Sequence, residues 1–137
     1  MNLTEEDRKA LVSIRLQKAK ETISEVHGNI QMKFWRTAAN RLYYACYFAV
    51  SALLVKNGIA AHTHSGVISQ MGLHFVKKGI ISKEWGRFYK ELFYLRQDGD
   101  YDDWFDIGEK DVVDLVGPAE EFIAKIEKLI NESENEY

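Results

Sequence analysis

The chain has little of the residues that cross-link or break a helix, and it has no apolar run long enough to span a bilayer. Its 137 residues include one cysteine, Cys46, and one proline, Pro118. A lone cysteine excludes an internal disulfide. The uncharged apolar run at residues 42–55 is shorter than the roughly 20 residues that a membrane-spanning helix needs. We therefore expect no membrane insertion and a buried or interface helix over this run.

An excess of charge of either sign is also missing. The net charge is −3, and the estimated pI is 5.8. Such a balance does not indicate nucleic-acid binding by the whole surface, so any RNA-binding role would require a local basic cleft. The start "MNLTEEDRKA" lacks the apolar core of a secretory signal. We expect a cytoplasmic protein.

Most of the sequence shows the periodicity of apolar residues that is typical of helices, and no segment shows a strand pattern. Apolar residues recur three and four apart, and glycines separate the periodic segments. The predicted helices cover about residues 4–27, 30–57, 65–78, from 83 to the turn-rich segment after Arg96, and from 109 onward. This pattern predicts one all-α domain over residues 1–137, an antiparallel four- to five-helix up-and-down bundle with a polar tail at 131–137.

The segment "AANRLYYACYFAV" at residues 38–50 places an arginine at the start of the apolar run. Asn40, Tyr44, Tyr47 and Ser51 fall on one helical face, with Arg41 beside them. Bringing a guanidinium toward an apolar surface costs several kcal/mol unless acceptors meet it, at about the scale known for buried ions. Arg41 therefore needs a partner. That partner is either an intramolecular carboxylate or helix-end carbonyl, or a ligand.

The segment "LRQDGDYDDW" presents a second arginine, Arg96, followed by several aspartates. A local charge pair and Asp-capped turns explain it simply, because Asp and Gly favour turns over helix. Asp98, Asp100, Asp102 and Glu109 also fit positions one, three, five and twelve of a calcium loop. The sixth position is Asp103 where that loop needs glycine, so we expect no calcium site.

The segment "HTHSG" at residues 62–66 offers two imidazoles, fewer than the three or four ligands of a zinc site. We expect Thr63 or Ser65 to cap the next helix and a histidine to form a hydrogen bond nearby. Glycine-rich phosphate loops, dinucleotide fingerprints and nucleophile elbows are lacking. The sequence therefore predicts no metal and no cofactor.

Three separated segments carry a family resemblance: "ANRLYYACYFAVSALLVKNGI", "HTHSGVISQMGLHFVKKGII" and "LFYLRQDGDYDDW". Together they resemble the HEPN domains, in a prokaryotic branch marked by Asn-Arg-x-Tyr-Tyr-Ala, His-Ser-Gly and a late Arg-x-x-x-Asp-Tyr. The order and spacing match over about residues 8–130.

The resemblance implies a helical bundle that pairs as a homodimer, often encoded beside a small nucleotidyltransferase in toxin–antitoxin modules. Several relatives are metal-independent endoribonucleases. In them an arginine and a histidine a few residues later line a cleft between two protomers. The histidine handles the proton of the RNA 2′-hydroxyl, and the arginine stabilises the phosphorane charge.

This sequence departs from that catalytic pattern, because none of its four histidines follows an arginine at the required distance. The matching position is Arg96-Gln97 followed by Asp100-Tyr101. An ionised aspartate is a poor general acid and repels phosphate. We expect Asp100 to hold Arg96 or Arg41 instead.

The leading interpretation is a HEPN-type toxin–antitoxin component that binds a nucleotide, RNA or a nucleotidyltransferase partner. One alternative is a metal-independent endoribonuclease, and another is a purely structural helical interaction domain. A homodimer is expected because the helix after Arg41 is apolar on every side, with more apolar surface than three neighbours readily cover. The candidate ligand-binding residues are Asn40, Arg41, Tyr44, Arg96, Asp100 and Tyr101, and the candidates for a ribonuclease are Arg41, His64, Arg96 and Tyr101.

Overall fold

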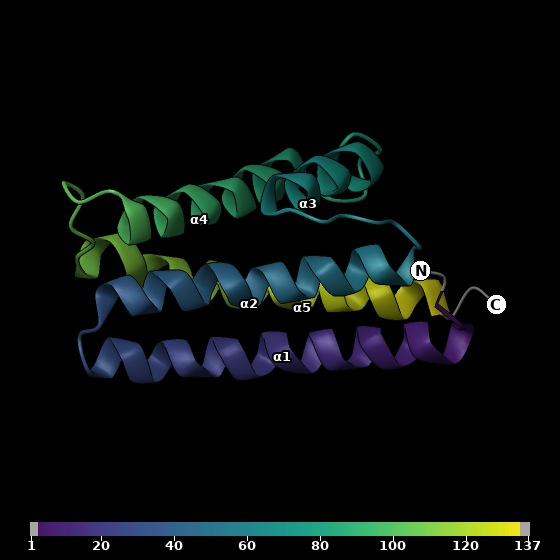
Figure 1. Ribbon diagram of the computed structural model, residues 1–137, viewed down its shortest axis with the longest axis horizontal. Helices are drawn as coiled ribbons and strands as arrows, with labels where there is room; N and C mark the ends of the chain where they lie inside the picture. Colours follow the sequence, from purple (N-terminus) through teal and green to yellow (C-terminus); the bar gives the residue numbers. More distant parts are fainter. Residues whose placement is uncertain (1–2, 135–137) are drawn as a thin grey trace.

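The computed structural model describes residues 3–134, and within these residues the chain is helical with no strand (Figure 1). The predicted all-α bundle is confirmed. Long helices that follow one another run in opposite directions, and α3 continues into a short π-type turn. The elements are α1 (Glu5–Gln31), α2 (Trp35–Lys56), α3 (His64–Met71), the π-type turn (Gly72–Val76), α4 (Lys83–Tyr101) and α5 (Glu109–Glu134).

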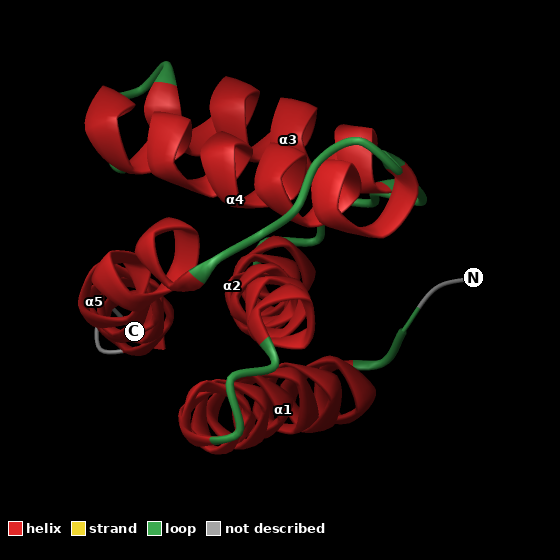
Figure 2. Ribbon diagram, turned by 90° about the vertical axis from the view of Figure 1, so that its left-hand side faces the viewer, coloured by secondary structure: helices red, strands yellow, loops and turns green. Residues whose placement is uncertain are grey.

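Helix α2 forms the centre of the bundle, with α1, α5 and the α3–α4 layer around it (Figure 2). Small side chains dominate its buried surface, so neighbouring backbones approach closely. The fully covered small residues are Ala38, Ala39, Ala45, Cys46, Ala49 and Ala52. The apolar surface of α2 is thus largely covered within one chain, and that surface alone does not require a second copy.

Side-chain caps begin three of the helices, and the expected cap at Thr63 is one of them. The Thr4 hydroxyl accepts a hydrogen bond from the Asp7 amide at 3.0 Å. The Thr63 hydroxyl accepts from the Gly66 amide at 2.9 Å, and Ser82 caps α4 in the same way. Each cap satisfies an amide that has no partner inside its helix.

The boundary between the first two helices differs from the prediction. Helix α1 runs past Gly28 to Gln31, and α2 begins at Trp35 rather than near Ile30. The chain reverses at Lys33, which adopts a left-handed backbone with φ of 61°. Glycine was the wrong signal here, because helical glycine is tolerated and the reversal occurs at a lysine.

Helix α4 also extends further than predicted, since it continues through Gly99 and ends at Tyr101. Its end still falls within the turn-rich segment that the sequence predicts to break the helix, five residues past Arg96. Gly99 packs so closely on Ile107 and Arg36 that an added Cβ would collide with the Ile107 side chain. Tertiary packing therefore outweighs the low helix propensity of Gly and Asp.

At the end of the chain, α5 continues through Pro118 to Glu134, so residues 131–134 of the predicted polar tail are helical. Residues 135–137 of that tail lie outside the described residues. Among residues 3–134, no helix combines the length and apolarity required to cross a membrane.

Candidate functional site

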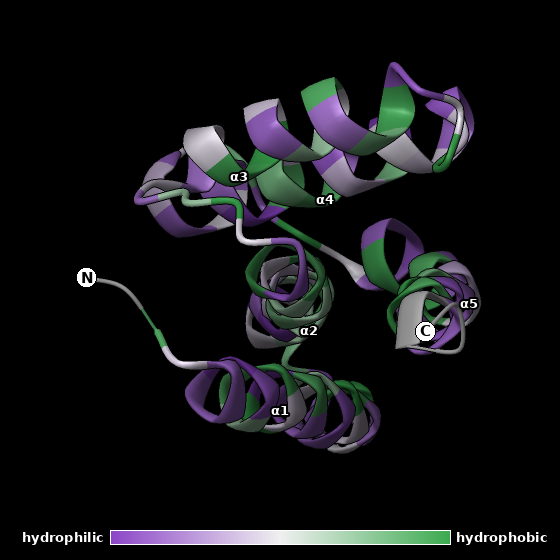
Figure 3. Ribbon diagram, turned by 90° about the vertical axis from the view of Figure 1, so that its right-hand side faces the viewer, coloured by the Kyte–Doolittle hydropathy of each residue, from purple (hydrophilic) through white to green (hydrophobic). Residues whose placement is uncertain are grey.

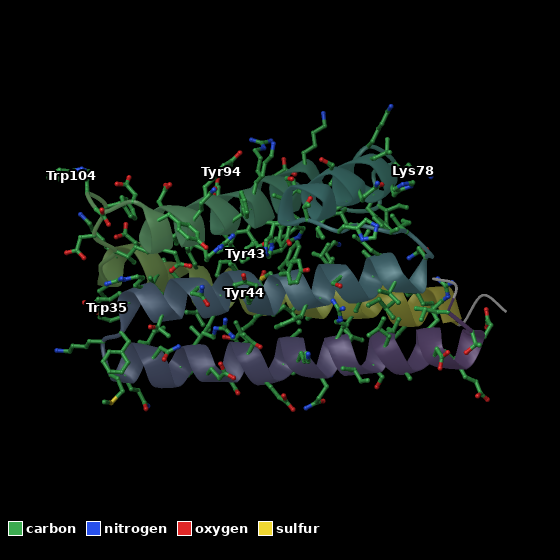
Figure 4. All side chains as sticks on the ribbon, viewed as in Figure 1. Trp35, Tyr43, Tyr44, Lys78, Tyr94 and Trp104 are labelled. Carbon is green, nitrogen blue, oxygen red and sulfur yellow. The ribbon has the colours of Figure 1, made fainter. Side chains whose placement is uncertain are left out.

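An aromatic cluster joins α2, α3 and α4 near the middle of the bundle, where Figure 4 shows Tyr43 and Tyr44 on α2 below α4. The ring centroids of Tyr43 and Tyr89 lie 5.7 Å apart in a stacked arrangement, and those of Tyr47 and His64 lie 4.9 Å apart. Such offset and edge contacts favour a rigid arrangement. We use the name aromatic cluster for Tyr43, Tyr44, Tyr47, His64, Tyr89 and Phe93.

Arg96 lies within this cluster and is 6% exposed. Its guanidinium carbon is 5.1 Å from the centroid of the Tyr43 ring and 5.4 Å from that of Phe93. Among the described residues, its buried Nε has no hydrogen-bond partner and no carboxylate forms an ion pair with it. Arg96 is therefore a largely buried cation that contacts aromatic faces and no carboxylate among the described residues.

Tyr101 lies over the same guanidinium from the end of α4, with its ring centroid 5.9 Å from the guanidinium carbon. It is 74% exposed. Tyr101 thus lies between the Arg96 guanidinium and the surface of the protein.

His64 occupies the first position of α3 and faces the cluster. Its Nδ1 lies 2.7 Å from the Tyr43 hydroxyl. Burial, with a smaller contribution from the Arg96 charge, lowers the pKa of His64, so the imidazole is neutral near pH 7. Burial raises the pKa of Tyr43 to about 12. The protonated phenol can donate to Nδ1, and the neutral ring then carries its proton on Nε2.

Arg41 sits at the edge of the cluster in a chain of polar contacts. Its Nε and Nη2 donate to Asn40 Oδ1 at 3.1 and 2.7 Å. Its Nη1 lies 3.9 Å from a carboxylate oxygen of Glu25, and its guanidinium carbon lies 5.1 Å from the Tyr44 ring centroid. A long ion pair to an exposed carboxylate adds little stability.

Asp100 belongs to this chain, but not as predicted. Its carboxylate accepts a hydrogen bond from Asn40 Nδ2 at 3.0 Å. Within residues 3–134 it pairs with neither Arg96 nor Arg41, so the expectation that Asp100 holds one of them was wrong. The reason is geometric, because the continued helix α4 carries Asp100 to Asn40.

The structure places every candidate residue from the sequence in or beside this one region, with Asn40 and Asp100 at its edge and Tyr101 exposed beside Arg96. Sequence reasoning missed Tyr43, Tyr89 and Phe93, which hold His64 and Arg96 in place. Tyr43 lies inside the quoted Asn-Arg-x-Tyr-Tyr motif, which was a usable signal. Tyr89 and Phe93 carried no signal beyond helical spacing.

Metal chemistry has no visible basis in this region. Asp98 and Asp100 lie on α4 rather than in a loop, so the calcium-loop pattern is not folded as one. Within the described residues, no group of three or more His, Cys, Asp or Glu side chains is arranged to hold a metal ion.

The fold and this region define an all-α module in which a buried cation, an imidazole and tyrosine hydroxyls lie together. Comparison with known proteins identifies the family to which such a module belongs. The family model described as "HEPN domain" matches residues 12–129. The chain belongs to the HEPN domain family.

Individual relatives refine this placement. A "UPF0332 protein" of Thermotoga maritima is 34% identical over 126 residues, which cover 92% of this chain and 96% of the relative. The "Putative toxin MJ0142" of Methanocaldococcus jannaschii is 26% identical over 115 residues, covering 84% and 78% of the two chains. A "UPF0332 protein" of Archaeoglobus fulgidus is 21% identical over 122 residues, covering 89% and 97%.

Proposed function

We propose that this HEPN-type chain is a component of a toxin–antitoxin-like system and binds the phosphates of an RNA strand at Arg96. The observation that carries the proposal is Arg96, a side chain only 6% exposed, whose buried Nε has no hydrogen-bond partner and which forms no ion pair among the described residues. The toxin-named relative in Methanocaldococcus jannaschii supports the system-level part.

Burying the Arg96 guanidinium has an unfavourable free energy of desolvation. Cation–π attraction to each aromatic face offsets about 0.5–2 kcal/mol of it. Aromatic rings offer no hydrogen-bond acceptors of the usual kind, whereas a phosphate matches the geometry of arginine and accepts strong charge-assisted hydrogen bonds from it. The neighbouring tyrosine rings supply faces on which unpaired bases stack.

Binding is favoured over cleavage by the residues that follow Arg96. The position nearest to the family's catalytic histidine holds Asp100, whose carboxylate is engaged by Asn40. A carboxylate held in this way does not replace the imidazole that handles the proton in the family's ribonucleases.

One observation favours ribonuclease activity as a second candidate. His64 reaches the Arg96 region from a different helix, and its neutral imidazole is oriented by Tyr43. A neutral imidazole beside a phosphate-binding arginine is equipped to accept the proton of a 2′-hydroxyl.

RNA titration separates the two candidates. We expect labelled single-stranded RNA to bind and to stay full length in the presence of a chelator. Log affinity should fall linearly with log salt, and the slope should decrease in magnitude by about 0.7 when Arg96 is replaced, the value for one phosphate contact on a single strand. Electrophoresis and fluorescence anisotropy provide the two measurements.

Chelator-resistant cleavage that disappears in both His64→Ala and Arg96→Met would replace the binding proposal with the ribonuclease. RNA affinity that is absent, or unchanged in Arg96→Met, would contradict phosphate binding at Arg96.

We also propose that a second copy of the chain packs on the aromatic surface at the end of α4. Trp104 is 96% exposed and Tyr94 is 54% exposed. Figure 4 shows Tyr94 on the outer side of α4 and Trp104 at the adjoining loop. Exposed aromatic side chains are typical of interface cores.

Sedimentation at micromolar concentration tests the dimer. The expected mass is twice the 15.9 kDa of one chain, and Trp104→Ser should shift the equilibrium toward the monomer. A wild-type monomer at this concentration would contradict the dimer, whereas a stable complex formed only with a nucleotidyltransferase would assign the surface to that partner.

A further inference from the structure

A second basic site lies at the end of the bundle opposite Asn40 and Asp100. A cavity of about 490 Å³ opens where the start of α1, the end of α2 and the connection from Asn57 to Thr63 meet. Figure 3 views the molecule from this end. The volume is within the range of about 300–1,000 Å³ that is typical of small-molecule sites.

Two arginines of α1 line this cavity, and both donate to neutral acceptors. Arg8 Nη1 donates to the Val55 carbonyl oxygen at 2.9 Å, and Arg15 Nη1 donates to the Ser51 hydroxyl at 2.6 Å. No carboxylate lines the cavity, and no described residue forms an ion pair with either guanidinium. We call this the basic pocket.

The two charges are not equally compensated. Arg8 meets the carbonyl end of α2, where the helix dipole amounts to about half a negative charge. Arg15 meets only the hydroxyl of Ser51, which is neutral. Arg15 therefore has the larger uncompensated charge, with most of its donors unused.

The arginines follow one face of α1. They are seven residues apart in the sequence, which corresponds to about 10 Å along the helix axis. Apolar residues such as Leu54, Ile59 and Val67 also line the cavity, together with Tyr47 and His62. A lining that combines basic and apolar side chains is complementary to a ligand with an anionic part and an apolar part.

Backbone geometry holds one side of the pocket in place. Gly58 adopts φ of 69°, and a Cβ there would lie 3.1 Å from Arg8 Nη1. The left-handed turn at Gly58 therefore lets the chain close around the Arg8 guanidinium. Thus Arg8 is fixed before a ligand arrives, which lowers the entropy cost of binding.

We propose that the basic pocket binds a small molecule that carries phosphate groups, of nucleotide size, with Arg15 as the main phosphate contact. Guanidinium forks match phosphate oxygens in two-point contacts. The pocket shares Tyr47 with the aromatic cluster, but its charged groups come from α1 rather than α4. It is thus a second site, independent of RNA binding at Arg96.

Calorimetric titration with ADP, pyrophosphate and malonate tests the proposal. ADP and pyrophosphate should bind saturably, and Arg15→Gln should weaken ADP binding at least tenfold. Lys9→Gln is the matched control, because Lys9 is an exposed cation on the same helix and does not line the pocket. Lys9→Gln and Arg96→Met should each change ADP affinity less than twofold, and thermal melting confirms that every variant is folded.

Several results would overturn this assignment. One is the absence of saturable ADP and pyrophosphate binding at millimolar concentration. Another is an equal loss in Lys9→Gln and Arg15→Gln, which would indicate nonspecific attraction. Malonate binding as tight as pyrophosphate binding would remove the phosphate assignment. ADP binding lost in Arg96→Met but kept in Arg15→Gln would move the ligand to the Arg96 site, leaving the proposed function intact.

Discussion

Replacing Arg96 with methionine is expected to weaken RNA binding at least tenfold while the free protein remains as stable as wild type or becomes more stable. The binding loss follows from removing a charge-assisted contact worth about 1.5–3 kcal/mol. The effect on stability follows from the absence of a described counter-ion: methionine removes a desolvated charge from an aromatic cluster. Replacing a buried ion pair by apolar side chains of similar volume is often neutral or stabilising by about 1–4 kcal/mol, and at Arg96 no described carboxylate would be left unpaired.

Methionine also keeps part of the packing, since its thioether contacts aromatic rings favourably. The substitution also removes the cation–π attraction, which limits any increase in the free energy of unfolding. We therefore expect this free energy to be equal to or higher than that of wild type. Denaturant unfolding and RNA titration of the same preparation measure both effects.

The control is Arg87→Met, which removes the same charge from an exposed position on α4. The Arg87 side chain is 70% exposed and lies 4.0 Å from Glu84. It should alter both RNA affinity and stability only slightly. A drop of several kcal/mol in the unfolding free energy of Arg96→Met would show instead that Arg96 is a structural strut, and the phosphate proposal would lose its basis.

Two glycines inside helices should respond to alanine with opposite signs. Gly99→Ala is expected to lower the free energy of unfolding by about 1–3 kcal/mol, because the new methyl group collides with the buried Ile107 side chain. Gly28→Ala should raise it by about 0.5–1 kcal/mol, since nothing lies within 4 Å of the new group and alanine is the better helix former. Denaturant unfolding of both variants measures the contrast.

The pair controls for helix propensity, which favours alanine at both positions. An increase in stability for Gly99→Ala would show that α4 does not pack on Ile107 as described. A helix end closer to Arg96 would then be the better interpretation.

Local signals explain why most of the fold was predictable. Thr4, Thr63 and Ser82 cap helices because a hydroxyl satisfies an amide three residues away, and this needs no tertiary contact. The apolar periodicity likewise defines which face of each helix is buried. Family motifs, being short and in fixed order, identified the region around Arg41 and Arg96 before any contact was known.

The sequence named residues that lie near one another in the structure, but it did not predict their contacts. Arg41 was expected to have a partner, and the structure supplies Asn40 and a long contact to Glu25. Asp100 was assigned to an arginine and bonds to Asn40 instead. These partners depend on how far α4 continues, which a weak local preference at Gly99 could not reveal.

By itself, the sequence determined an all-α bundle, most helix starts, the HEPN resemblance and the set of charged and aromatic residues available for a site. Tertiary structure alone decided that His64 meets Tyr43, that Arg96 is buried without a described counter-ion, and that Arg8 and Arg15 face a cavity. The physical reason is the sequence distance over which each interaction acts. Caps and periodicity depend on residues a few positions apart. The contacts between helices depend instead on the rotation and offset of whole helices, which the packed core determines collectively.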